Sequence, residues 1–91
     1  MRLFYSRHAM ERMFQRAISP ATVERIVRKN HVVAEYPDDQ PYPSCLLLGF
    51  DGARPIHVVV GYDRKRDEAY IVTVYEPDRE AWSDDFSKRR K

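Results

Sequence analysis

The chain has 91 residues, with 43% hydrophobic and 33% charged side chains, so it can bury one small core but cannot build two domains. Its longest apolar run, Cys45–Phe50, is far shorter than a bilayer-spanning helix of about 20 residues, and the formal net charge is +2. These values exclude two-domain enzymes, fully disordered chains and proteins with a membrane-spanning helix. We expect a soluble, cytoplasmic protein whose only cysteine, Cys45, is a buried structural thiol.

The near-neutral total hides three blocks of different charge. Residues 1–30 contain seven basic residues against two acidic ones, whereas residues 31–63 contain one basic residue against five acidic ones. The remaining residues, 64–91, include eight basic and seven acidic side chains. Positive charge is therefore concentrated at the N-terminal end, where it either attracts phosphate or forms an ordinary solvated helix surface.

Two helices are predicted in the first third of the chain. Ser6 is a good N-cap, and the segment from His8 to Arg16 contains strong helix formers without Gly or Pro. Ile18-Ser19-Pro20 predicts the start of a second helix, which extends to Lys29. On a helical projection the first helix has one apolar side, which we expect to face the core: Ala9, Met10, Met13, Phe14 and Ala17.

Beyond residue 30 the pattern changes to β-branched and aromatic residues. Strands are predicted at residues 31–36, 44–50, 55–62 and 69–76. The last three are joined by short polar connectors, which favour an antiparallel meander. A turn or short helix around residues 78–86 is expected to return Trp82 to the body, and residues 87–91 to form a frayed basic tail.

These elements predict an α+β domain in which two N-terminal helices pack on one face of a twisted, four-stranded, mainly antiparallel sheet. The opposite face stays exposed in this arrangement. Strict alternation along the last two strands puts His57 and Val59 on one face, together with Ile71, Thr73 and Tyr75. Because this set includes the more polar residues, we place the functional site on its side of the sheet.

A row of basic groups follows the polar side of the first helix. His8, Arg12 and Arg16 stand at successive i, i+4 positions, so they lie above one another on the helix surface. Guanidinium groups bind phosphate through paired hydrogen bonds, and a histidine titrates near neutral pH. The row is therefore a candidate phosphate site, with a solvated helix face as the alternative.

His57 interrupts the apolar strand Ile56–Val60 and has the most unusual setting of the three histidines. It is either a satisfied structural histidine or a general acid or base, with Tyr75 as its hydroxyl partner and Arg12 or Arg16 as the anion stabiliser. The second arrangement suits cleavage of RNA by its own 2′-hydroxyl, which requires neither a metal nor a protein nucleophile. Tyrosines that could stack exposed bases, or lie at the edge of the core, are Tyr36, Tyr42 and Tyr62.

Several catalytic and cofactor motifs are missing from the sequence. It contains no Gly-rich phosphate loop, no paired-cysteine zinc signature and no Gly-x-Ser-x-Gly motif. The histidines are scattered singly over three predicted elements, without the spacing of metal ligands. We therefore expect no metal and no other cofactor.

Four segments together resemble a family of small bacterial domains of unknown function. They are residues 6–19 (SRHAMERMFQRAIS), 42–49 (YPSCLLLG), 55–60 (PIHVVV) and 71–78 (IVTVYEPD). That family is similar to the RelE/ParE-like toxins and to the wider barnase, EndoU, colicin and RelE-like ribonuclease fold. One departure is Ala17, where such chains usually have Gly before Ile-Ser.

The resemblance implies that residues 1–86 form a single RelE-like domain, followed by the basic tail at 87–91. It implies a toxin of a type II toxin–antitoxin module, a metal-independent endoribonuclease that acts on mRNA, with the ribosome as a candidate partner. A helix-turn-helix or zinc-finger antitoxin is the implied protein partner, and no membrane is involved. The family pattern points to six residues: His8, Arg12, Arg16, His57, Thr73 and Tyr75. We expect His57, Tyr75, His8 and Arg12 to act in catalysis, and Arg16, Thr73 and Arg7 to bind RNA.

Fold similarity alone does not establish nuclease activity, because related scaffolds include gyrase poisons. A non-catalytic protein-binding module and a gyrase-targeting, ParE-like toxin are therefore the alternatives. A nucleic-acid-binding regulator is a third reading, and it requires duplex binding that weakens steeply with salt.

Overall fold

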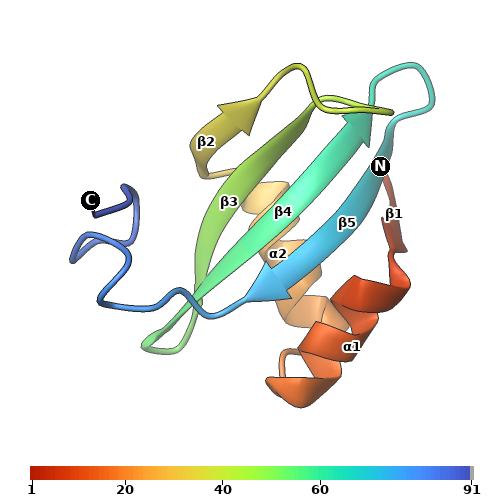
Figure 1. The fold of residues 1–91 in the computed structure, drawn as a ribbon. Helices are drawn as coiled ribbons and strands as arrows, with labels where there is room; N and C mark the ends of the chain where they lie inside the picture. Colours follow the sequence, from red (N-terminus) through yellow and green to blue (C-terminus); the bar gives the residue numbers. More distant parts are fainter. Residues whose placement is uncertain (91) are drawn as a thin grey trace.

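Five strands and two helices make up residues 1–90, the part of the chain that the computed structural model describes (Figure 1). Their order is β1 (Arg2–Tyr5), α1 (Arg7–Gln15), α2 (Pro20–Lys29), β2 (Val32–Tyr36), β3 (Ser44–Asp51), β4 (Arg54–Asp63) and β5 (Glu68–Tyr75). The predicted α+β class is confirmed, with both helices packed on the same side of one sheet. No helix in this described part is long and apolar enough to cross a membrane.

The sheet is mixed and has the strand order β1-β5-β4-β3-β2. β2 to β5 pair antiparallel, and the last three strands form the meander that was predicted. The prediction of four strands was wrong, because residues 2–5 form β1 and pair in parallel with β5. β1 has only four residues, and Arg2 at its start lies opposite Glu68, far away in the sequence. No local sequence pattern can therefore indicate this pairing.

Both helices begin at the serines that their sequences indicate. The Ser6 hydroxyl accepts a hydrogen bond from the Ala9 amide at 2.9 Å, and the Ser19 hydroxyl accepts one from the Thr22 amide at 3.1 Å. α2 ends at Asn30, which adopts a left-handed conformation with φ of 56°. This conformation stops the helix and turns the chain into β2.

α1 buries a narrower face than its apolar pattern predicts. Ala9 and Met13 are buried, but Met10 is 53% exposed and Phe14 is 89% exposed. α1 packs against β5, towards the edge of the sheet, whereas α2 packs against the central strands β3 and β4. The expectation that Met10 and Phe14 face the core was wrong, because a helix at the sheet edge contacts the core along a narrow stripe.

Apolar clusters lie on both faces of the sheet. On the face that we call the helix face, buried residues of α1 and α2 pack against β3, β4 and β5. On the other, the outer face, Trp82 and Phe86 pack against Leu46 and Leu48 of β3. These two aromatic residues belong to the C-terminal segment, residues 76–90, which covers part of a face that we expected to be exposed. As predicted, Trp82 returns to the body, where it is 7% exposed.

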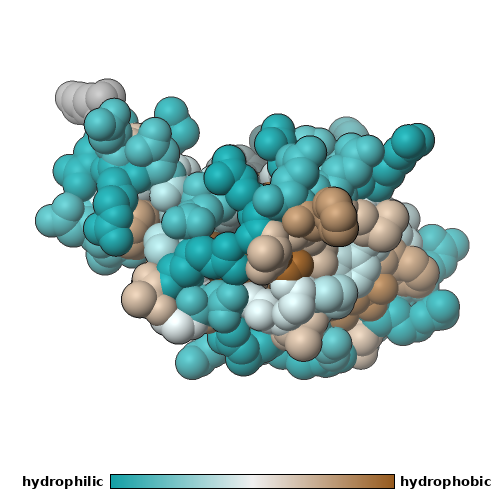
Figure 2. Space-filling model, turned by 90° about the horizontal axis from the view of Figure 1, so that it is seen from below, coloured by the Kyte–Doolittle hydropathy of each residue, from teal (hydrophilic) through white to brown (hydrophobic). Residues whose placement is uncertain are grey.

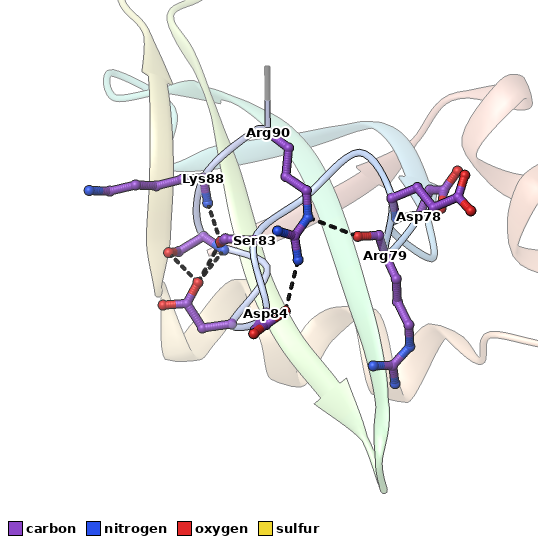
Figure 3. Close-up of polar contacts among 9 residues, drawn as sticks. Asp78, Arg79, Ser83, Asp84, Lys88 and Arg90 are labelled. Atoms are coloured by element: carbon purple, nitrogen blue, oxygen red, sulfur yellow. Dashed lines mark hydrogen bonds and ion pairs between the residues drawn. The ribbon is translucent and has the colours of Figure 1, made fainter.

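The C-terminal segment contains turns and is linked by many polar contacts of its own (Figure 3). The Arg90 guanidinium pairs with Asp84 at 2.8 Å, and an isolated antiparallel bridge joins Arg89 to Trp82. The described part of the predicted basic tail therefore packs back on the preceding turns instead of fraying. Lys91 lies outside the described residues.

β5 contains a β-bulge that changes which side chains share a face. Val59 and Val60 are neighbours in β4, but they pair with Thr73 and Ile71, so Val72 is an extra residue. Ile71 consequently packs in the cluster on the helix face, while Thr73 lies on the outer face. The prediction that Ile71 shares a face with Thr73 was wrong, since it assumed unbroken alternation.

Gly49 in β3 allows α2 to approach the sheet closely. A Cβ atom at this position would overlap the side chain of Ile26 in α2. We expect Gly49→Ala to lower the free energy of unfolding by about 1–3 kcal/mol through overpacking, as measured by urea denaturation. In an Ile26→Ala background, which removes the two closest atoms, the same change should cost much less. Equal costs in both backgrounds would contradict this close contact.

Candidate functional site

His8 and Thr73 meet where α1 lies beside β5. The Nε2 atom of His8, in the first turn of α1, is 3.0 Å from the Oγ1 atom of Thr73. Both were predicted as site residues, although 65 positions separate them in the sequence. His8 is exposed, so its imidazole can reach a ligand while it stays bonded to Thr73.

Ser6 joins the start of α1 to the bulge in β5. Its amide donates a hydrogen bond to the Ile71 carbonyl at 3.1 Å, and its hydroxyl donates one to the Val72 carbonyl at 2.9 Å. The same hydroxyl oxygen also accepts the capping bond of α1. The bulge places Thr73 on the outer face directly after this joint, and its Oγ1 atom makes the contact with His8.

We expect Ser6→Ala to lower the free energy of unfolding by about 1–2 kcal/mol, because it removes both the cap and the bond to β5. Ser19→Ala is the matched control, since Ser19 caps α2 but makes no bond to a strand. In NMR spectra, the ring resonances of His8 should shift in the Ser6 variant and stay unchanged in the Ser19 variant. Unchanged His8 resonances in both variants would contradict the positioning role of Ser6.

Arg12 and Arg16 continue the line that begins at His8. α1 runs beside the C-terminal half of β5 (Figure 1). Four residues along a helix advance by about 6 Å, and two residues along a strand advance by about 6.7 Å. Residues at i, i+4 positions of α1 therefore stay level with alternate residues of β5. Arg16 accordingly lines a hollow together with Pro77, two residues beyond the end of β5. Neither arginine has a carboxylate partner within residues 1–90, and both are exposed. The residues of this line, which we call the α1–β5 strip, are His8, Arg12, Arg16 and Thr73.

Arg7, a further predicted RNA contact, lies outside this strip. Its side chain is 91% exposed and its Nε atom pairs with a Glu11 carboxylate oxygen at 3.5 Å. Consecutive helix residues are separated by about 100° around the axis, so Arg7 and His8 occupy different sides of α1.

His57 is enclosed between the sheet and the C-terminal segment. Its Nε2 atom is 2.9 Å from the Phe86 carbonyl oxygen, which can only accept, so this nitrogen carries the proton. The other nitrogen, Nδ1, therefore accepts from the Tyr75 hydroxyl at 3.2 Å. The Trp82 ring meets the imidazole edge-on, with centroids 4.5 Å apart. Burial lowers the pKa of His57, although the bond to Phe86 opposes this effect, and burial raises the pKa of Tyr75.

The structure separates the predicted catalytic residues into two groups. His8 and Thr73 lie with the arginines of the α1–β5 strip, whereas His57 is paired with Tyr75 beneath the C-terminal segment. A general acid or base must reach the proton that it transfers, but His57 has no exposed surface and both of its nitrogens are bonded. The geometry of His57 therefore fits a satisfied structural histidine, the alternative to a general acid or base.

Three aromatic rings stack across the outer face near the start of β5. The Phe4 and Tyr70 rings have centroids 5.3 Å apart, and the Tyr42 ring stacks on Tyr70 at the same distance. Tyr42 lies over Gly61 of β4, where no side chain competes for the space. Tyr42 thus folds its loop onto the sheet, which leaves less of its ring for base stacking. Sequence reasoning missed Phe4 and Tyr70, although a glycine within a strand often marks such a close approach.

The α1–β5 strip offers an imidazole, the Thr73 hydroxyl group and two guanidinium groups without carboxylate partners among the described residues. Such a set can hold an anion and transfer a proton. Within residues 1–90, no group of three or more His, Cys, Asp or Glu side chains could hold a metal ion. The chemistry that this set supports is binding of a phosphate ester, with proton transfer at His8.

Comparison with protein families found a match that covers most of the chain. The model of a domain of unknown function (DUF4258) matches residues 5–76, from the last residue of β1 to the first residue after β5. The matched region contains the whole α1–β5 strip, but it ends before Trp82 and Phe86, which cover His57. Neither the curated proteins nor the solved structures gave a match.

Proposed function

Because the chain belongs to the DUF4258 family of domains of unknown function, we propose a function from its site: it is an RNA-cleaving toxin of a type II toxin–antitoxin module. The observation that carries the proposal is the exposed His8–Thr73 pair, followed along α1 by two arginines without carboxylate partners. The earlier resemblance to RelE/ParE-like toxins supports the same class and a RelE-like assignment of residues 1–86. mRNA is the proposed substrate, and a helix-turn-helix or zinc-finger antitoxin is the proposed partner.

Cleavage would use the ribose 2′-hydroxyl as the nucleophile. With His8 Nε2 bonded to Thr73, the Nδ1 atom takes the proton of the 2′-hydroxyl, and a bond forms between the 2′-oxygen and phosphorus. The bond from phosphorus to the 5′-oxygen breaks, and that oxygen takes a proton from water. The products are a 2′,3′-cyclic phosphate and a 5′-hydroxyl. Arg12 stabilises the extra negative charge on the phosphorus centre, and Arg16 holds a neighbouring phosphate.

The test is cleavage of a labelled single-stranded RNA by the purified chain. We expect fragments that end in a 2′,3′-cyclic phosphate, at the same rate with and without a metal chelator. Gln15→Ala is the control, because Gln15 is an exposed residue of α1 outside the strip. Intact RNA in the test tube, together with intact cellular RNA after induced expression, would overturn the proposal.

The salt dependence of RNA binding should show whether Arg12 contacts a phosphate. For single-stranded RNA, each neutralised phosphate contributes about 0.7 to the slope of log K against log salt. We expect Arg12→Gln to reduce this slope by about 0.7, whereas Arg7→Gln should leave it unchanged, because Arg7 pairs with Glu11. The measurement is fluorescence anisotropy of a labelled RNA at several salt concentrations. A larger loss for Arg7 than for Arg12 would contradict the assignment of the strip.

A protein-binding toxin, including a gyrase-targeting one, is the second candidate. It is favoured by the exposed apolar residues Met10 and Phe14, which lie four positions apart on α1. Seen from below (Figure 2), apolar side chains gather on the side of the molecule where α1 lies, away from the mostly hydrophilic C-terminal segment. Toxicity that is lost in Phe14→Ser while RNA stays intact, with a stalled topoisomerase, would favour this candidate.

A further inference from the structure

A groove runs along the end of the sheet that neither helix covers. It consists of two adjoining hollows of about 570 and 490 Å³ on the β2, β3 and β4 side of the fold. The residues shared by both hollows are Glu35, Cys45, Val60, Tyr62 and Arg64. None of the α1–β5 strip residues lines either hollow, so the groove is a separate surface.

The groove exists because the helices are short relative to the strands. α2 and β4 both contain ten residues, which corresponds to about 15 Å of helix but about 33 Å of strand. In Figure 1, α2 lies behind the middle of the sheet and α1 lies beside its lower end, so the upper end stays uncovered. The floor is formed by the apolar strand residues Val32, Leu47, Val60 and Ala69, together with Val27 at the end of α2.

The rim of the groove carries more unpaired positive charge than unpaired negative charge. Arg64 and Lys65 line it from the β4–β5 connection, and neither side chain has a carboxylate partner within residues 1–90. Asp63 is only 8% exposed, and its carboxylate already pairs with Arg66. Glu35 is therefore the one exposed carboxylate among the residues that line the two hollows.

We propose that this groove docks an acidic, amphipathic segment of a partner protein. Apolar side chains of the segment rest on the floor, and its carboxylates face Arg64 and Lys65. The two hollows share five lining residues and so form one continuous, elongated groove, a shape that suits a peptide segment. The surface differs from a nucleic-acid site, since an apolar floor does not bind phosphate. This proposal does not depend on RNA cleavage.

Cys45 provides a direct readout, because it is the only cysteine of the chain and it lines both hollows. Burial raises the pKa of its thiol, so labelling by a maleimide is slow enough to follow. The probe is a synthetic helical peptide with Leu on one side and Glu on the other. At about ten times its Kd, this peptide should slow labelling roughly tenfold. The same peptide with Lys in place of Glu should give no protection.

Two charge reversals sharpen the test. Arg64→Glu should weaken the protection by the Leu/Glu peptide roughly fivefold, whereas Lys88→Glu, an exposed cation away from the groove, should not change it. Urea denaturation checks that both variants fold. Equal protection by the Lys peptide, no protection by the Leu/Glu peptide at millimolar concentration, or protection by a single-stranded oligonucleotide instead would each overturn the proposal.

Discussion

Replacing His8 by alanine should lower the rate of RNA cleavage by about 10²–10⁴, because it removes the only imidazole of the α1–β5 strip that a substrate can reach. The loss should appear in single-turnover cleavage at saturating enzyme, where weaker binding does not contribute. Stability should change little, since His8 is exposed and lies outside the buried clusters. The comparison therefore separates a chemical role from a folding defect.

Thr73→Val is the companion to this variant. It preserves the shape of the side chain but removes the hydroxyl that holds the His8 ring. We expect an intermediate loss of roughly tenfold, since the imidazole remains and only its orientation is freed. Full activity of both variants would exclude His8 as the proton-transfer group and leave the strip as a binding surface only.

The second large effect concerns stability. His57→Ala should lower the free energy of unfolding by roughly 3–5 kcal/mol, because it creates a cavity and leaves one buried and one partly buried polar group without their partner. Those groups are the Phe86 carbonyl and the Tyr75 hydroxyl. Urea unfolding can be followed by the fluorescence of Trp82, the single tryptophan, whose ring touches the imidazole. Val58→Ala, on the same strand but the helix face, is the control for a cavity without polar loss.

The pH dependence of stability offers an independent check on His57. Burial holds its pKa below the ordinary value of 6.5, so the unfolded chain binds a proton more readily than the folded one. Its contribution to stability is present above about pH 6.5 and is lost as the pH falls towards the folded pKa. We expect this acid-side loss in the natural chain and its absence in His57→Ala. A stable His57→Ala protein whose cleavage rate falls by about 10²–10⁴ would instead make His57 catalytic.

Local signals predicted most of the secondary structure. The caps at Ser6 and Ser19 formed because each depends on a hydroxyl and an amide three residues later. The connector after Asp51 formed the hairpin between β3 and β4, since Gly52 takes the positive φ of 63° that this turn requires. These elements needed no information from distant parts of the chain.

The features that sequence reasoning missed all depend on distant partners. β1 becomes a strand only because its four residues pair with the edge of β5. The bulge at Val72 arises where Ser6 binds the β5 backbone, so periodicity within β5 alone cannot reveal it. The C-terminal segment covers the outer face because Trp82 and Phe86 find apolar partners there.

At the site, the residue types could be predicted but their grouping could not. Histidine, arginine and threonine were selected from their chemistry and spacing, and His8 and Thr73 do meet. Nothing in the sequence ranks His8 above His57, because the burial of His57 is produced by a segment nearly thirty residues later. Exposure is a tertiary property, and it decides which of the two imidazoles can exchange protons with a substrate.

The parallel pairing of β1 with β5 also sets the order in which the molecule can assemble during synthesis. Residues 2–5 are synthesised well before their partner strand, which begins only at Glu68. Until β5 has emerged, α1 has no strand to pack on, and His8 cannot meet Thr73. Such long-range contacts form late in folding. A nascent chain that lacks β5 would therefore have neither a complete sheet nor an assembled site.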